Sequence, residues 1–195
     1  MNLAHRWLCN SRMWRKAVQT HIVPWALENV ELGAKVLEIG PGPGVTTACL
    51  RVVAADLTCI EIDAKSASSL SRRMAGNAVR VVAGDGSAMP LPDDAFDAAV
   101  CFTMLHHIPS IVLQDRLLRE VMRVLRPEGI FVGTDSVASG PFRLFHLFDK
   151  IAPVNPHNFS ERLRAARFAN IQVDVRRHDF RFRAQKPPRK GDQVG

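Results

Sequence analysis

Three glycines at alternate positions follow a short apolar run in the first quarter of the chain. Gly40, Gly42 and Gly44 stand directly after residues 35–39 and directly before a helix-like segment, 45–53. Glycine has no Cβ, so the backbone can turn sharply here and approach a ligand closely, and the first N–H groups of the helix remain available as donors. The pattern predicts a loop that binds a nucleotide-like ligand, although three glycines also suit a purely structural strand-to-helix turn.

Two carboxylates follow the next two apolar runs. Glu61 ends the run 57–61, and Asp85 lies in Gly84-Asp85-Gly86-Ser87 after the run 79–82. Glu61 can accept hydrogen bonds from both hydroxyls of a ribose, and Asp85 can accept from an adenine amino group while the Gly86 N–H donates to a ring nitrogen. Each carboxylate could also be an ordinary surface acid. Because the carboxyl ends of parallel strands share one edge of a sheet, the three signals together predict one adenosine-binding crevice.

The elements that must position these residues alternate between strand and helix. This order is typical of crossover units in a parallel sheet. A later helix over 161–168 precedes two runs of period two, 171–175 and 180–182, which predict a closing antiparallel pair. We therefore expect an α/β fold, a Rossmann-like doubly wound sheet of about seven mostly parallel strands with the last one antiparallel and with helices on both faces. The other expected strands are 35–39, 57–61, 79–82, 96–102 and 129–133, and the expected helices between them are 45–53, 64–74 and 110–125.

Length and composition fit one globular domain. The chain has 195 residues, 47% hydrophobic and 23% charged, which argues against a disordered or fibrous protein. The formal net charge is +7, and the stretch 159–195 holds ten Lys and Arg against four Asp and Glu. Such a stretch suits contact with nucleic acid or anionic lipid but is more often solvated surface. We expect an N-terminal helical segment at 1–34, a ligand-binding domain at 35–184 with a substrate-side cap at 136–159, and a flexible basic tail at 185–195.

Five motifs of the chain form the pattern of a known family. They are Glu38-x-Gly40-x-Gly42-x-Gly44, Glu61 within Cys-Ile-Glu-Ile-Asp, Asp85 followed by Met89-Pro-Leu-Pro-Asp-Asp-Ala-Phe-Asp97, Leu105-His-His-Ile108, and Leu125-Arg-Pro-Glu-Gly129. Over about residues 35–175 the sequence resembles the class I S-adenosylmethionine (SAM) dependent methyltransferases, and within them the small-molecule branch of ubiquinone and menaquinone biosynthesis. One position departs from the family pattern, because Arg167 stands where a glycine usually precedes the phenylalanine. The end of helix 161–168 must therefore take a left-handed conformation with an arginine, or end differently.

The resemblance implies that SAM is the cofactor, and it assigns residues to the parts of SAM. Glu38 would order the glycine loop, Glu61 would hold the ribose and Asp85 the adenine. The methionine moiety would pass the loop residues Gly40, Pro41, Gly42 and Gly44, and further cofactor contacts are expected from Ile62, Gly86 and Phe102. Methyl transfer depends mostly on aligning the acceptor, the methyl carbon and the sulfur, so no side chain is assigned as catalytic.

The acceptor is expected beside the fourth strand and under the cap. His106 and His107 follow that strand, and either could remove a proton near neutral pH or simply anchor the loop before Ser110. Phe142 and His146 belong to the cap, whose phenylalanines suit an apolar acceptor but recur every three residues, as in an ordinary packed helix. The expected reaction is methyl transfer from SAM to a small, apolar or amphipathic acceptor such as a lipid, quinone or secondary metabolite.

Three alternative functions remain open. A dehydrogenase is disfavoured because the glycine spacing is not Gly-x-Gly-x-x-Gly and the chain contains no tyrosine. A nucleic-acid methyltransferase is disfavoured because Cys101-Phe-Thr-Met-Leu-His-His107 lacks the Asn/Asp-Pro-Pro-aromatic segment that holds a flipped base. A protein that binds SAM without catalysis would carry the same motifs.

Cysteine and tryptophan usage bears on location. The four cysteines form no CxxC pair, which favours a reducing, cytoplasmic compartment and predicts no metal site. The apolar stretches are too short or too interrupted to predict a signal peptide or a membrane span. Trp7, Trp14 and Trp25 lie among basic residues, so the N-terminal segment could contact a membrane surface peripherally or cover the cofactor.

Overall fold

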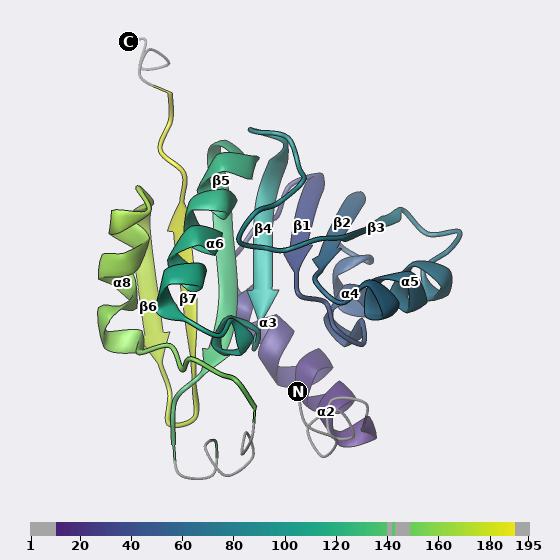
Figure 1. Cartoon of the computed structure of the whole chain (residues 1–195), viewed down its shortest axis with the longest axis horizontal. Coiled ribbons are helices and arrows are strands. Elements are labelled where there is room, and N and C mark those ends of the chain that lie inside the picture. The colour runs from purple at the N-terminus through teal and green to yellow at the C-terminus, as the bar shows by residue number, and fades with distance from the viewer. Residues whose placement is uncertain (1–10, 140–141, 143–148, 190–195) are drawn as a thin grey trace.

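The computed structural model describes residues 11–139, 142 and 149–189, and its central feature is a seven-stranded sheet (Figure 1). The strand order is β3-β2-β1-β4-β5-β7-β6. The first five strands run parallel, and β7 pairs antiparallel with both β5 and β6. The expected α/β fold and its closing antiparallel pair are therefore confirmed. The strands are β1 Lys35–Ile39, β2 Asp56–Glu61, β3 Val79–Ala83, β4 Phe96–Phe102, β5 Leu125–Ser136, β6 Ala169–Val175 and β7 Asp179–Gln185.

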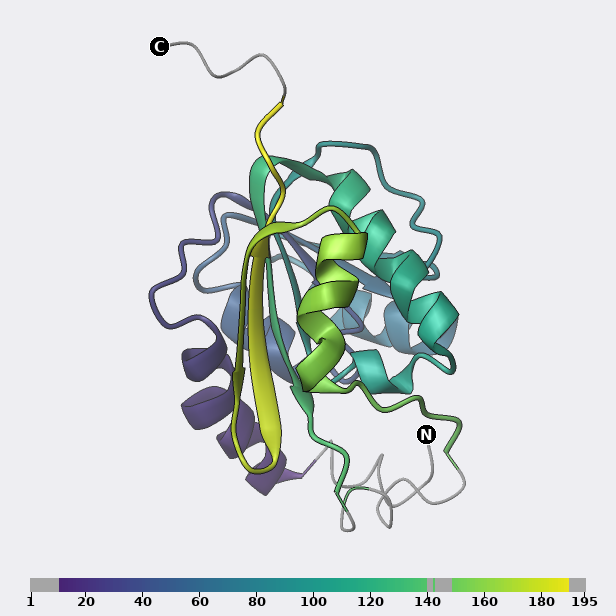
Figure 2. The same cartoon turned by 90° about the vertical axis from the view of Figure 1, so that its left-hand side faces the viewer.

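Helices cover both faces of this sheet, as Figure 2 shows along its edge. One face packs against α6 and α8, and the other against the N-terminal helices, α4 and α5. Alternate residues of β1 enter the two cores, with Leu37 and Ile39 in one and Val36 in the other, as expected for a strand buried on both sides. The helical elements are α2 Arg12–Ala17, η1 Val18–Ile22, α3 Val23–Ala26, α4 Val45–Leu50, α5 Ala64–Arg73, η2 Leu105–His107, α6 Ile111–Val124 and α8 Pro156–Ala165.

The last helix differs from its predicted range. It was expected over 161–168, but α8 begins five residues earlier, at Pro156. The Asn155 side chain accepts a hydrogen bond from the His157 N–H at 3.0 Å, and a proline at the first helical position is already in helical conformation. Phe159, which we expected in the cap, therefore belongs to α8. Its side chain is buried and contacts Phe182 of β7, so it packs in the core.

Arg167 takes the first of the two conformations expected for it. Its φ is +73°, in the left-handed region. The Phe168 N–H donates to the Leu163 carbonyl at 3.1 Å, and the Arg167 N–H donates to the Arg164 carbonyl at 2.8 Å. These two bonds form a Schellman motif, in which Phe168 and Leu163 both enter the core. The motif forms without its usual glycine, and Arg167 instead adopts the left-handed backbone conformation, which is strained for a residue with a side chain.

The N-terminal helices pack on the protein itself. Trp14 lies against the core that also contains Val18. The guanidinium carbon of Arg176 lies 3.7 Å from the ring centre of Trp25, and Arg181 donates to the Trp25 carbonyl at 2.7 Å. Trp7 lies outside the described residues. Among the described helices, none is both long enough and apolar enough to cross a membrane.

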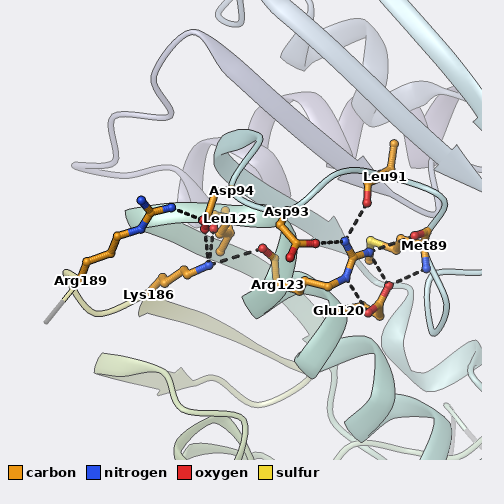
Figure 3. A network of polar contacts seen from close by, with 9 residues as sticks. All are labelled: Met89, Leu91, Asp93, Asp94, Glu120, Arg123, Leu125, Lys186 and Arg189. Carbon is orange, nitrogen blue, oxygen red and sulfur yellow. Dashed lines mark hydrogen bonds and ion pairs between the residues drawn. The ribbon is translucent and has the colours of Figure 1, made fainter.

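The chain after β7 is held to the domain as far as it is described (Figure 3). Lys186 Nζ donates to Asp94 at 2.7 Å and to the Leu125 carbonyl at 2.6 Å, and Arg189 pairs with the same aspartate at 2.5 Å. Beside them, Arg123 joins Asp93 and Glu120. The sequence predicts mobility from residue 185, and in the described part Gln185, Lys186 and Arg189 contact residues that are far away in the chain. Residues 190–195 lie outside the described part.

Candidate functional site

The glycine loop after β1 combines three left-handed residues. Gly40, Gly42 and Gly44 have φ values of +65°, +50° and +77°. A Cβ at Gly40 would collide with the Met104 side chain, and a Cβ at Gly44 would collide with Leu70. A Cβ at Gly42 would meet nothing within 4 Å, and this residue lines the cleft described below. A side chain at the first or last glycine would need Met104 or Leu70 to move, while the middle one keeps ligand space open.

Glu38 lies beneath this loop and holds the start of α4. Its carboxylate is 1% exposed and accepts hydrogen bonds from the hydroxyls of Thr46 and Thr47, the latter at 2.6 Å. The Cys59 thiol donates to it at 3.3 Å. Burial raises the pKa of Glu38, and these hydrogen bonds oppose that rise. Glu38 therefore supports the loop from behind and does not line the cleft.

Glu61 connects the end of β2 to the same loop. One carboxylate oxygen accepts the Gly42 N–H at 3.1 Å, and the other accepts the Asp63 N–H at 3.0 Å. The side chain is 8% exposed and lines the cleft. These bonds fix the carboxylate, and each oxygen keeps a further lone pair for a hydroxyl donor.

The loop after β3 brings the second carboxylate to the cleft. The Gly84 N–H donates to the Glu61 carbonyl at 2.9 Å, so the β2–β3 ladder continues into this loop. Asp85 Oδ1 accepts the Ser87 N–H at 2.7 Å, which closes a local turn. A Cβ on Gly86 would lie 3.0 Å from a methyl of Leu117 on α6. Glycine therefore allows this loop to lie close to α6.

These strand ends enclose one cleft of about 880 Å³ at the carboxyl edge of the parallel strands, which is the lower edge in Figure 1. Its lining includes six of the predicted cofactor residues and one of the predicted acceptor residues: Gly40, Gly42, Glu61, Ile62, Asp85, Gly86 and His107. Six other predicted residues do not line it, namely Glu38, Pro41, Gly44, Phe102, His106 and Phe142. These six are buried. His146 lies outside the described residues.

The polar wall formed by α5 was not foreseen from the sequence. Lys65, Ser66, Ser69 and Arg73 line the cleft. Arg73 donates to the Pro43 carbonyl of the glycine loop at 2.9 Å and to the Ser69 hydroxyl at 2.8 Å. Positions 66, 69 and 73 share one helical face, and this spacing in a segment predicted to be helical is the signal that could have found them.

The opposite side of the cleft rests on buried polar contacts. The His106 N–H donates to Asp135 at 2.9 Å, and the His106 ring contacts the same carboxylate, which is fully buried at the end of β5. Gln114 of α6 is also buried, and its amide donates to the carbonyls of Leu105 at 3.0 Å and Ala152 at 2.7 Å. His106 thus contacts a buried carboxylate, whereas the next residue, His107, lines the cleft.

Comparisons with known proteins agree with this geometry. Residues 37–133 match the family model described as "Methyltransferase domain". A demethylmenaquinone methyltransferase of Mycolicibacterium paratuberculosis is 35% identical over 127 residues, which cover 64% of this chain and 49% of that protein. A fatty-acid O-methyltransferase of Mycolicibacterium smegmatis is 33% identical over 124 residues, covering 63% and 44%. The chain thus spans about half or less of the length of these relatives.

A solved structure supports the fold. The Haemonchus contortus phosphoethanolamine N-methyltransferase 2, in complex with SAM, superposes with a TM-score of 0.72 over 94% of this chain and 56% of its own, at 14% identity. Fold and family together define a class I SAM-dependent methyltransferase. Within this class, the two relatives named above are a demethylmenaquinone methyltransferase and a fatty-acid O-methyltransferase.

Proposed function

We propose that the protein transfers a methyl group from SAM to a small acceptor that is apolar or amphipathic. One observation carries the proposal: Gly42, Glu61 and Asp85, from three strand ends, line the same cleft. The cleft volume of about 880 Å³ lies near the top of the range of roughly 300–1,000 Å³ for ligand pockets. A nucleoside-sized cofactor would leave room there for a second ligand.

The nucleoside part of SAM would lie between β2 and β3. Glu61 would accept hydrogen bonds from the two ribose hydroxyls. Asp85 would accept one from the adenine amino group, and the Gly86 N–H would donate to a ring nitrogen. Ile62 is 72% exposed and lines the cleft, so its side chain is available to pack on the adenine face.

The methionine part would pass along the glycine loop. Gly40 and Gly42 would let the backbone approach it, while Pro41 and Gly44 would maintain the shape of the loop. Glu38 and Phe102 would act from behind as supports, since both are buried and neither lines the cleft.

When bound, SAM supplies a methyl group on a positively charged sulfonium. Held by Glu61, Asp85 and the glycine loop, SAM would supply this methyl carbon to an acceptor lone pair, and the sulfur would keep the electron pair of the broken sulfur–carbon bond, giving S-adenosylhomocysteine. The protein would contribute alignment and exclusion of water. A base is needed only if the acceptor carries a proton, and His107, which lines the cleft, is the candidate for that role.

Binding of S-adenosylhomocysteine tests the cofactor part of the proposal. In calorimetry, we expect binding of this product and no binding of NADH. Glu61→Ala and Asp85→Ala should each weaken binding at least tenfold, because each removes charge-assisted acceptors. Asp56→Ala is the matched control, since Asp56 is exposed at the opposite end of β2. Unchanged affinity in both cleft variants would refute the assignment.

A labelling experiment tests the transfer itself. The protein is incubated with SAM carrying a labelled methyl group, together with lipid extract, metabolite extract or RNA. We expect the label to appear in extractable small molecules, and we expect the Asp85→Ala variant to produce less of it. Label in RNA would show that the acceptor is a nucleic acid and not a small molecule. Tight cofactor binding with no labelled product would favour a protein that binds SAM without catalysis.

A further inference from the structure

The first turn of α6 exposes two large apolar side chains next to each other. Ile111 is 58% exposed and Val112 is 61% exposed. Single exposed hydrophobic residues are ordinary, whereas a contiguous apolar group beside a cleft indicates a binding surface. Whether this pair is part of a binding surface therefore depends on its position relative to the cleft.

The pair is continuous with the wall of the cleft. Ile108 and Pro109 precede it and Leu113 follows it, and all three line the cleft. Ser110 between them is the N-cap of α6, and its hydroxyl accepts the Leu113 N–H at 3.2 Å. We call Ile108, Pro109, Ile111 and Val112 the apolar lip. Two of its residues, Ile108 and Pro109, line the cleft, and the other two, Ile111 and Val112, are exposed and lie in the chain between lining residues.

The other walls of the cleft differ in chemistry. The α5 wall presents Lys65, Ser66, Ser69 and Arg73, which suit polar groups. Glu61 and Asp85 are assigned above to the nucleoside. An apolar ligand is therefore expected on the remaining side, where Met104 and Leu113 line the cleft together with Ile108 and Pro109 of the apolar lip.

The apolar lip is held in place before any ligand binds. Gln114 follows Leu113 on α6. It is buried and donates to the Leu105 and Ala152 carbonyls. Together with the Ser110 cap, these bonds fix the start of α6. A preorganised surface loses little conformational entropy on binding, so apolar contact there contributes efficiently to affinity.

We propose that the acceptor carries a hydrocarbon chain that lies across the apolar lip while its methyl-accepting end reaches into the cleft. This inference rests on the proposed function and deepens it. Each methylene group that leaves water for such a surface should increase affinity roughly two- to fourfold. The affinity of acceptor analogues should therefore grow with chain length and depend on Ile111 and Val112.

Binding of simple amphiphiles tests the proposal. The protein is saturated with S-adenosylhomocysteine, and octanoate, tetradecanoate, octanol and tetradecanol are titrated below their aggregation concentrations in calorimetry. The lip variant is Ile111→Ser/Val112→Ser. The matched control is Val52→Ser/Val53→Ser, because Val52 and Val53 are 77% and 61% exposed and do not line the cleft.

For at least one of the two head groups, we expect the long chain to bind at least tenfold more tightly than the short one. The lip variant should lose at least tenfold in long-chain affinity, the control should change less than twofold, and S-adenosylhomocysteine affinity should be equal in all three proteins. Absence of chain-length dependence for both head groups, or equal losses in both variants, would overturn the inference. A failure of S-adenosylhomocysteine to bind the wild type would instead count against the proposed function.

Discussion

The two sides of the cleft are built in different ways. On the side of β1, β2 and β3, loops close in sequence hold one another, as where Gly42 donates to Glu61, 19 positions later. On the side of β4, β5 and α6, the supporting contacts join distant segments, as where Gln114 donates to Ala152, 38 positions later. The first side can be predicted from short motifs at the ends of strands, whereas the buried contacts of the second side have no such motif. Variants that affect one side and spare the other can test this difference.

The largest expected effect is on the side of β4, β5 and α6, which is the proposed acceptor side, at Asp135. Asp135→Ala removes a fully buried carboxylate that accepts the His106 N–H and contacts the His106 ring. We expect the free energy of unfolding to fall by about 3–5 kcal/mol, because removing one partner leaves the other buried without compensation. Urea unfolding measures this loss.

The control for Asp135 is an exposed carboxylate that has a charged partner. Asp174, with its side chain 58% exposed, pairs with Arg181 at 2.7 Å, and Asp174→Ala should cost less than about 1 kcal/mol. Where the Asp135 variant is still folded, its S-adenosylhomocysteine affinity should stay within about twofold of the wild type. An affinity loss above tenfold would show that the two sides are not independent.

The next largest effect is expected on the side of β1, β2 and β3, which is the proposed cofactor side, at Gly42. Gly42→Val places a branched side chain in open space that belongs to the cleft, so S-adenosylhomocysteine affinity should fall more than a hundredfold. Gly76→Val is the matched control, because Gly76 also has a positive φ, +82°, and also has nothing within 4 Å of an added Cβ. Both variants should lose about 1–2 kcal/mol of stability from the left-handed backbone. Calorimetry and urea unfolding separate the two effects, and equal affinity in both variants would contradict the assigned role of Gly42.

A smaller effect is expected at Gln114, which joins α6 to the segment around Ala152. Gln114→Leu leaves the Leu105 and Ala152 carbonyls without this donor, and should cost about 1–3 kcal/mol. Hydrogen exchange should accelerate in residues 149–154 and remain unchanged in the glycine loop. Gln172→Leu, at an exposed position of β6, is the control. Acceleration of both regions in the Gln114 variant would mean that the whole domain has loosened.

The same difference explains which predictions from the sequence succeed. The strands 35–39 and 96–102 are found as predicted, because uninterrupted apolar runs bounded by turn residues mark buried parallel strands. Glu61 and Asp85 share one cleft, because strand ends in such a sheet converge whatever the loops contain. Position along a strand is therefore enough to predict that these two carboxylates share a cleft.

The acceptor side illustrates what a sequence cannot reveal. His106 and His107 are adjacent and chemically identical, yet one is buried against Asp135 and the other lines the cleft. The difference is set by Asp135, 29 residues away, for which no local pattern exists. The predicted start of α8 is wrong for a different reason. Asn155 and Pro156 form a recognisable helix cap, but the apolar periodicity that follows them is weak and does not indicate a helix.

The smallest effect is a pH dependence with opposite signs on the two sides. Burial raises the pKa of Glu38 above its ordinary value of 4.5, whereas the Arg123 guanidinium lowers the pKa of Glu120 on α6 below that value. A raised carboxyl pKa means that the carboxyl group keeps its proton to a higher pH in the folded state than in the unfolded state. Stability from Glu38 is therefore present below pH 4.5 and is lost as the pH rises above it. Stability from Glu120 is present above pH 4.5 and is lost as the pH falls below it.

Unfolding in urea across this pH range, for the wild type, Glu38→Gln and Glu120→Gln, separates the two groups. Relative to Glu38→Gln, the wild type should lose stability as the pH rises from 4.5, because the glutamine needs no proton to remain neutral. Relative to Glu120→Gln, it should lose stability as the pH falls from 4.5. Equal slopes in the two comparisons would mean that the pKa of Glu38, like that of Glu120, is lowered in the folded protein. The hydrogen bonds from Thr46 and Thr47 would then outweigh its burial, and the glycine loop would rest on a charge.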